Sequence, residues 1–220
     1  MRSKVIGTVA TLAMLAAWVS ICLSLHGGLG LRIDSRPHEA TGWVMAQEAL
    51  ARLQPSGQIT VIARDASTFK NPATVIQMAS FRKALGQAHA AMPSVHALQV
   101  DPLRPVEVPA GDFYSILKNA PKGSVIVSFM GPPMLTPSQC AQLGENKPAV
   151  VAFCAGSLPE LVDLKLLFQQ GVLQAAVVDR PGDRAPGPRR SNLRACFDQA
   201  YLVITAANLA DLPARIAGNP

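Results

Sequence analysis

The chain has 220 residues, of which 49% are hydrophobic and 15% are charged, and its formal net charge is +6. Charged residues make up about a quarter of an ordinary soluble domain, so this composition excludes a disordered polyelectrolyte. Four cysteines in a chain of this length also exclude a small domain held together mainly by disulfides. The composition indicates an apolar segment attached to an otherwise ordinary domain.

The apolar excess lies at the N-terminus, where residues 5–25 contain no charged side chain. A helix of that length spans a hydrocarbon layer of roughly 30 Å. Arg2 and Lys4 precede the segment, and positive flanks stay on the cytoplasmic side, so the rest of the chain would face outward. We therefore predict a retained signal anchor over residues 1–25, which would make this a single-pass membrane protein with a periplasmic C-terminal domain.

Three other interpretations of the same segment stay open. A cleaved signal peptide has a shorter apolar region of about 7–15 residues and small residues at its cleavage site. A lipoprotein signal would use Cys22 as the lipidated residue, although Ile21 is larger than the residue normally found before it. A fully buried helix would need a large protein to cover an apolar surface on all sides.

Residues 26–39 are predicted to be a linker because they combine three glycines, mixed charge and Pro37. Residues 40–220 are predicted to be one domain. Apolar residues at helical spacing predict helices at 40–53, after Asn71-Pro72, at 112–119, from 136, at 159–170 and at 193–198. Short β-branched runs predict strands at 59–63, 96–100, 124–129, 148–153, 172–178 and 201–205.

Strands that alternate with helices indicate parallel pairing, because parallel strands need crossover connections. Each crossover is expected to be right-handed. The predicted fold is therefore a three-layer, Rossmann-like α/β sandwich with a mainly parallel sheet of five or six strands, preceded by the transmembrane helix.

The positive charge is concentrated in one place, because five arginines lie within residues 180–194. A nucleic-acid-binding protein would carry a broad basic face with aromatic residues for stacking, whereas aromatics are only 5% here. We therefore expect no nucleic acid as a partner. The arginine-rich segment is either a solvated loop or a contact for anionic lipid head groups, a partner or an anionic ligand.

In an open parallel sheet, ligands bind beyond the carboxyl ends of the strands. The candidate ligand-binding residues are therefore those that follow predicted strands: Asp65, Ser67, Asp101, Asp179 and Arg180. Aspartate is also common in turns, because its carboxylate accepts hydrogen bonds from nearby backbone amides. Both roles stay open for each aspartate.

No pattern in the chain predicts catalysis. Gly-x-Ser-x-Gly, the Walker phosphate loop, a strand followed by Gly-x-Gly-x-x-Gly, and Cys-x-x-Cys are all absent from the sequence. We expect no catalytic residue, no metal site and no cofactor. Cys154 is interpreted as a buried apolar residue rather than a nucleophile, and a disulfide among Cys140, Cys154 and Cys196 stays open.

Residues 58–181 resemble one lobe of the type I periplasmic sugar-binding proteins of ABC transporters. The segments that carry the resemblance are Ile-Thr-Val-Ile-Ala before Asn71-Pro72, Gly-Ser-Val-Ile-Val-Ser at 123–128, Pro-Ala-Val-Val at 148–151, and Gln-Gly-Val-Leu-Gln-Ala-Ala-Val-Val at 170–178. The family has two lobes that close over the ligand, whereas this chain is long enough for one. The resemblance implies a sugar-like ligand and a periplasmic-binding-protein-like fold.

The sequence thus predicts a membrane-anchored extracytoplasmic domain that binds a small sugar-like ligand or a partner protein. One alternative is a non-catalytic structural subunit of a membrane or envelope complex. The other is a hydrolase that uses the same aspartates together with a divalent cation. Of these classes, an enzyme is the less favoured.

Overall fold

The computed structural model describes residues 34–65, 71–99, 108–144, 147–156, 162–181 and 192–212. The chain divides into two units, Met1–Asp34 and Ser35–Pro220, and only the second contains described helices and strands. In the part that is described, no helix is long and apolar enough to cross a membrane. The predicted anchor at 1–25 lies outside the described residues and stays a prediction.

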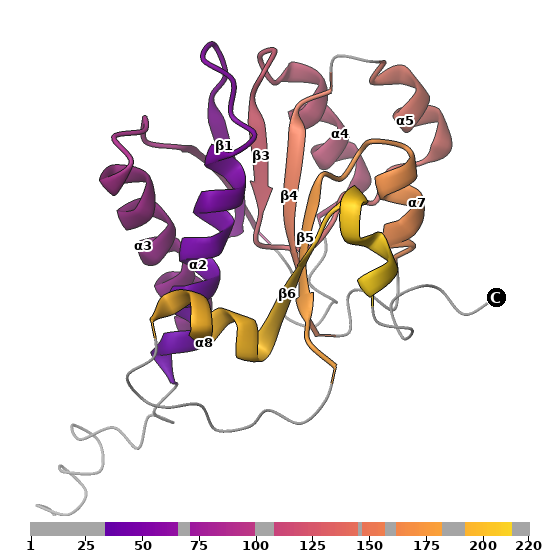
Figure 1. The fold of residues 1–220 in the computed structure, drawn as a ribbon. Coiled ribbons are helices and arrows are strands. Elements are labelled where there is room, and N and C mark those ends of the chain that lie inside the picture. Colours follow the sequence, from indigo (N-terminus) through magenta and orange to yellow (C-terminus); the bar gives the residue numbers. More distant parts are fainter. Residues whose placement is uncertain are drawn as a thin grey trace, which may run out of the picture. The chain divides into compact units, whose positions relative to one another are not determined.

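Helices and strands alternate through the second unit, as predicted (Figure 1). The strands are β1 (Ile59–Arg64), β2 (Ser94–Leu98), β3 (Val125–Ser128), β4 (Ala149–Cys154), β5 (Ala175–Asp179) and β6 (Tyr201–Ile204). The helices are α2 (Ser35–Leu50), α3 (Pro72–Gln87), α4 (Ala110–Asn119), α5 (Pro137–Gln142), α7 (Leu164–Gln169), α8 (Leu193–Ala200) and the short 3-10 helix η1 (Ala206–Asp211).

The six strands form one sheet in the order β2-β1-β3-β4-β5-β6. The first five strands are parallel and β6 is antiparallel to β5, so the prediction of a mainly parallel sheet is confirmed. The direction of β6 follows from where α8 ends. Arg180 N, just after β5, donates to Ala200 O at 2.9 Å, so β6 starts beside the carboxyl end of β5 and runs back along it.

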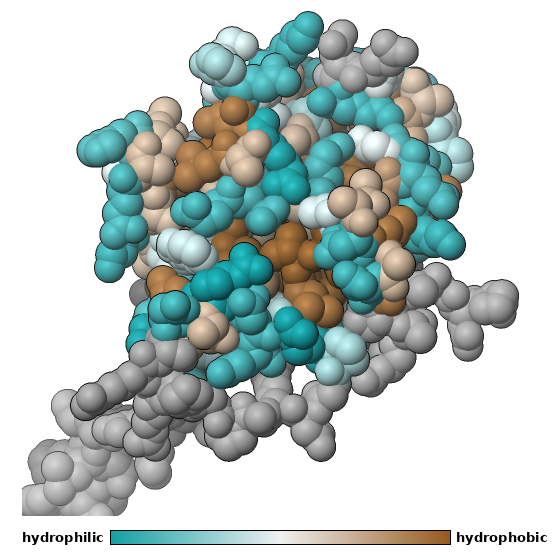
Figure 2. Space-filling view, viewed as in Figure 1, coloured by the Kyte–Doolittle hydropathy of each residue, from teal (hydrophilic) through white to brown (hydrophobic). Residues whose placement is uncertain are grey.

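Helices cover both faces of the sheet and make a three-layer sandwich (Figure 1). α2, α3 and α8 pack on one face, and α4, α5, α7 and η1 pack on the other. Successive strand residues alternate between the two cores: Val61 and Val127 lie in the first, and their neighbours Ile62 and Ile126 lie in the second. Hydrophobic side chains also reach the surface over β5 and β6 (Figure 2), where β6 is only half buried at its centre.

Helix α2 begins at Ser35, so residues 35–39, which we expected to belong to the linker, are helical. The prediction of linker rested partly on Pro37. Proline is tolerated in the first turn of a helix, because the backbone N–H groups there have no partner within the helix. The Thr41 hydroxyl donates to Pro37 O at 2.9 Å, which ties this first turn to the body of the helix.

Two predicted boundaries in the second half of the domain also differ. The helix expected at 159–170 is described only from Leu164, with Asp163 as its N-cap and Asp163 Oδ1 accepting from Leu166 N at 2.9 Å. The strand expected at 172–178 begins at Ala175, because Val172 and Leu173 fold back on α7 through backbone hydrogen bonds to Leu167 O.

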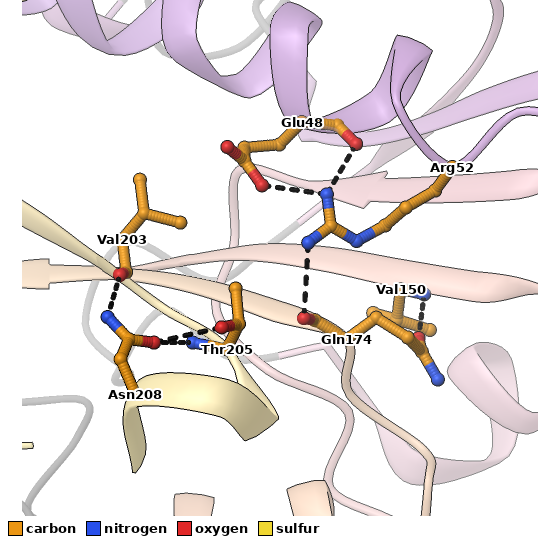
Figure 3. Close-up of polar contacts among 7 residues, drawn as sticks. All are labelled: Glu48, Arg52, Val150, Gln174, Val203, Thr205 and Asn208. Carbon is orange, nitrogen blue, oxygen red and sulfur yellow. Dashed lines mark hydrogen bonds and ion pairs between the residues drawn. The ribbon is translucent and has the colours of Figure 1, made fainter. Parts of the chain in front are cut away.

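Polar groups join the end of α2 to the amino edge of the sheet, by which we mean the side where the parallel strands begin (Figure 3). Arg52, in the turn after α2, pairs with Glu48 at 2.7 Å and also donates to Gln174 O at 3.4 Å. The Gln174 side chain accepts from Val150 N and donates to Gly171 O. One glutamine therefore connects the starts of β4 and β5 to the turn after α7.

Replacing Gln174 with alanine should lower the free energy of unfolding by about 1–3 kcal/mol, because the buried Val150 N–H would lose its acceptor. Urea denaturation followed by circular dichroism measures the change. Gln169→Ala is the matched control, since Gln169 is exposed on α7 and should change stability by about 0.5 kcal/mol or less. Equal stability of the two variants would contradict the role given to Gln174.

Candidate functional site

The order of the strands reverses between β1 and β3. From β1 the chain crosses to β2 on one side, whereas β3, β4 and β5 follow on the other side. In open α/β sheets, ligands bind at this switch point, on the side of the sheet where the parallel strands end. We call that side the carboxyl edge. The described residues that reach it are Asp65 after β1, Asn71 before α3, and residues 129–133 after β3.

Backbone hydrogen bonds fix the strand ends on either side of the switch point. Phe129 N donates to Ile62 O at 2.9 Å, so β3 stays beside β1 to its end. Asp65 N donates to Leu98 O at 2.8 Å, so the chain leaving β1 stays beside β2. The Asp65 side chain is half buried at this edge.

Helix α3 begins at the same edge. The Asn71 side chain accepts from Ala73 N at 3.0 Å, and Pro72 occupies the first helical position, as the sequence predicted. The N-terminal end of a helix carries a partial positive charge and unpaired N–H groups, which favour hydroxyl oxygens or anions.

The segment after β3 forms a buried floor at the switch point. Residues 130–133 are buried, and Gly131 has a φ of 97°, which only glycine adopts without strain. The buried Ser128 hydroxyl accepts from Met130 N at 3.3 Å.

Asp179 has a different environment. Its Oδ2 accepts from Gly156 N at 2.5 Å, which joins the end of β5 to the turn after β4. Gly156 has a φ of 81°, so this turn needs a left-handed residue. Asp179 therefore has a structural contact of the kind expected for aspartate in turns, while Arg180 beside it is exposed.

The structure does not bring Asp65 and Asp179 together. β3 and β4 lie between their strands, and three strand spacings of about 4.8 Å put their backbones roughly 14 Å apart. Ser67 and Asp101 lie outside the described residues, so their part in a common site stays a prediction. Among the described residues, no group of three or more histidine, cysteine, aspartate or glutamate side chains is placed to hold a metal ion.

Cys154, the last residue of β4, is fully buried, and burial raises the pKa of its thiol. A protonated, buried thiol is a poor nucleophile, which agrees with its interpretation as a core residue. Cys140 is buried in the same core, and neither residue forms a disulfide.

The sequence predicts Asn71 as a helix cap and predicts no contact for Gly156. Nothing in the sequence pairs Gly156 with Asp179, because the contact depends on β4 and β5 being neighbours. The one local indication of a tight turn there is Gly156 itself, which comes between a buried strand and Ser157.

No family model matches the chain, and no curated protein matches it. Similar solved structures include a solute-binding protein of an ABC transporter from Burkholderia graminis, in complex with D-arabinose. It is 17% identical over 78% of this chain and 61% of its own, with a TM-score of 0.44. A carbohydrate transporter solute-binding protein from Agrobacterium radiobacter, also with D-arabinose, is 11% identical over 81% of this chain and 61% of its own, with a TM-score of 0.47.

A sugar-binding protein of a sugar ABC transporter from Bacillus halodurans is 12% identical over 80% of this chain, with a TM-score of 0.46. All three are solute-binding or sugar-binding proteins of transporters, the class of protein that the sequence segments resemble. The chain spans about three fifths of the length of the first two structures (61% of each).

Proposed function

We propose that this chain is a membrane-anchored domain outside the cytoplasm that binds a small, sugar-like ligand at the carboxyl edge of its sheet. The observation that carries the proposal is the reversal of strand order between β1 and β3. Open α/β sheets bind ligands of many chemical classes at this point. The connections that follow the two neighbouring strands run on opposite faces of the sheet, and a crevice opens between them.

The residues at that edge suit a polyhydroxyl ligand. Asp65 supplies a carboxylate acceptor, and the N-terminal end of α3 supplies a partial positive charge. Gly131 carries no side chain that would narrow the floor of the site. The sugar class comes from the resemblance of the sequence segments. The membrane anchor comes from the uncharged segment 5–25 and its positive flank.

A thermal-shift screen of the full-length chain in lipid nanodiscs tests the proposal with D-arabinose, D-glucose and D-galactose. A ligand at 100 times its dissociation constant should stabilise the folded state by about 2.7 kcal/mol. For a domain of this size, that corresponds to a rise in Tm of roughly 5–10 °C.

A matched pair of variants places the ligand. Asp65→Asn should remove most of the shift, whereas Asp198→Asn on α8 should keep it, because Asp198 only pairs with Arg194 at the surface. No shift with any sugar, or the same shift in both variants, would refute binding at this edge. A shift with Mg²⁺ or Mn²⁺ in place of sugars would favour the hydrolase alternative.

One observation favours a second candidate, the non-catalytic subunit of an envelope complex. Asp179 uses a carboxylate oxygen to hold the turn after β4, which is the role a scaffold needs. In that case the edge would contact a partner protein, and the sugar screen would give no shift.

A further inference from the structure

A groove lies between α3 and the edge strand β2, on the α2 and α3 face of the sheet. Its volume is about 340 Å³. Ala63, Val95 and Ala97 line it from the strands, and Val75, Met78 and Arg82 line it from α3.

The groove stays open because α3 packs mainly on α2. Phe81 is buried and meets Phe129 edge to face at 5.7 Å, which anchors α3 over the centre of the sheet. Val75, Met78 and Ala79 lie at helical spacing on α3 and line the groove, and Met78 also packs against the core. The whole of β2 is exposed or half buried, although strands of parallel sheets are normally covered on both faces.

Two large hydrophobic side chains in the groove are unusually open to solvent. Val75 is 49% exposed and Val95 is 40% exposed. Neighbouring apolar side chains left open in this way mark interaction surfaces. A volume of about 340 Å³ lies at the lower end of the range for small-molecule sites, about 300–1,000 Å³.

The charged side chains of the groove are of one sign. Arg64 and Arg82 both line it, and no aspartate or glutamate is among the described residues that do so. Arg82 follows Met78 by one helical turn, so an anion at Arg82 would continue directly into an apolar chain lying along Met78 and Val75. Guanidinium groups recognise carboxylates by charge-assisted hydrogen bonds.

We propose that this groove is a binding site for a small amphipathic anion, a carboxylate with a medium-length aliphatic chain. The carboxylate pairs with Arg82, and the chain lies on Val75, Met78 and Val95. The groove meets the carboxyl end of β1 at Arg64 and Asn71, and its walls extend from there along the face of the sheet and the side of α3. The probes that test it are not sugars, so its binding is measured independently of the sugar site.

Isothermal titration of the full-length chain in nanodiscs tests this, with hexanoate and octanoate as probes and empty nanodiscs as the blank. Burying one more methylene strengthens binding about fourfold, so octanoate should bind about 15 times more tightly than hexanoate. Octanamide, which has the same chain and no charge, should bind at least about tenfold more weakly than octanoate.

Three variants assign the contacts. Arg82→Gln should weaken octanoate binding about tenfold or more and leave octanamide unchanged. Lys83→Gln removes the same charge one residue further along α3, from a side chain that does not line the groove. It should leave the affinities for octanoate and for octanamide unchanged. Ala97→Ile fills the floor from an exposed strand position and should abolish binding of both probes.

The proposal is overturned if octanoate binds equally to the wild-type chain and to Arg82→Gln, or if no octanoate binding is detected above the blank. Full binding by Ala97→Ile overturns it as well. Thermal unfolding of each variant, compared with the wild type, separates lost binding from lost folding.

Discussion

Replacing Gly42 with alanine should destabilise the domain by about 3 kcal/mol or more, the upper end of what overpacking costs. A Cβ at this position would lie 2.1 Å from Gln77 O and 3.0 Å from Ser80 Cβ. The first of these atoms belongs to the backbone of α3, so a side-chain rotation cannot relieve the overlap. The expected result is a Tm lower by roughly 6–12 °C for a domain of this size.

This large effect arises because α2 and α3 cross at Gly42. The Ser80 hydroxyl donates to Glu39 O at 2.6 Å, which holds the two helices at close approach one turn away. Separating them would break that bond and move Phe81 in its contact with Phe129. Because α3 also forms one wall of the groove, its displacement would change the groove volume.

Gly111→Ala is the control for the same substitution in another helix. A Cβ at Gly111 would meet no atom within 4 Å. Alanine also has the higher helix propensity, so this variant should gain up to about 1 kcal/mol. Chemical denaturation of both variants by urea checks the pair, and a Gly42→Ala domain as stable as the wild type would contradict the close crossing of α2 and α3.

The thiol of Cys154 should react with iodoacetamide at least about a thousandfold more slowly in the folded domain than in urea, because it reacts only when the core opens. Cys196 is only half buried and should be much less protected. Peptide mass spectrometry after timed labelling gives both rates. Equal rates for Cys154 and Cys196 would show that the end of β4 is open to solvent, and would restore Cys154 as a candidate nucleophile.

The same burial makes stability depend on pH. Burial raises the pKa of the Cys154 thiol above its ordinary value of 9.0, so between the two values the unfolded chain loses a proton that the folded domain keeps. The stabilising contribution is therefore complete below about pH 9 and falls as the pH rises, by up to about 1.4 kcal/mol per pH unit. Cys154→Ala lacks this contribution, so its stability should fall less steeply between about pH 9 and pH 10.

Much of the architecture could be predicted because local signals and buried periodicity agree. The β-branched run at 59–63 forms β1, and Asn71 with Pro72 opens α3 as their chemistry requires. The sequence predicts the start of α2 too late, at residue 40 and not at Ser35, because a proline in the first turn of a helix resembles a proline in a loop. Residue type alone cannot separate the two.

The remaining features depend on neighbours that are distant in the chain. The Asp179–Gly156 contact needs β4 and β5 to be adjacent, and the direction of β6 depends on where α8 ends. The row of α3 that includes Met78 has the pattern of a buried face. It lines a groove because Phe81 and Gly42 fix α3 against α2, and periodicity carries no information on which partner a helix face meets.

The central claim, that the carboxyl edge beside the switch point binds a sugar-like ligand, is tested most directly by hydrogen–deuterium exchange on the full-length chain in nanodiscs. The exchange is compared with and without the sugar that gives the largest thermal shift. Protection should appear in peptides that contain the carboxyl end of β1, the start of α3 and residues 129–134, and not in peptides at the amino edge around Gln174. Unchanged exchange at the carboxyl edge, or protection confined to the amino edge, would contradict the claim.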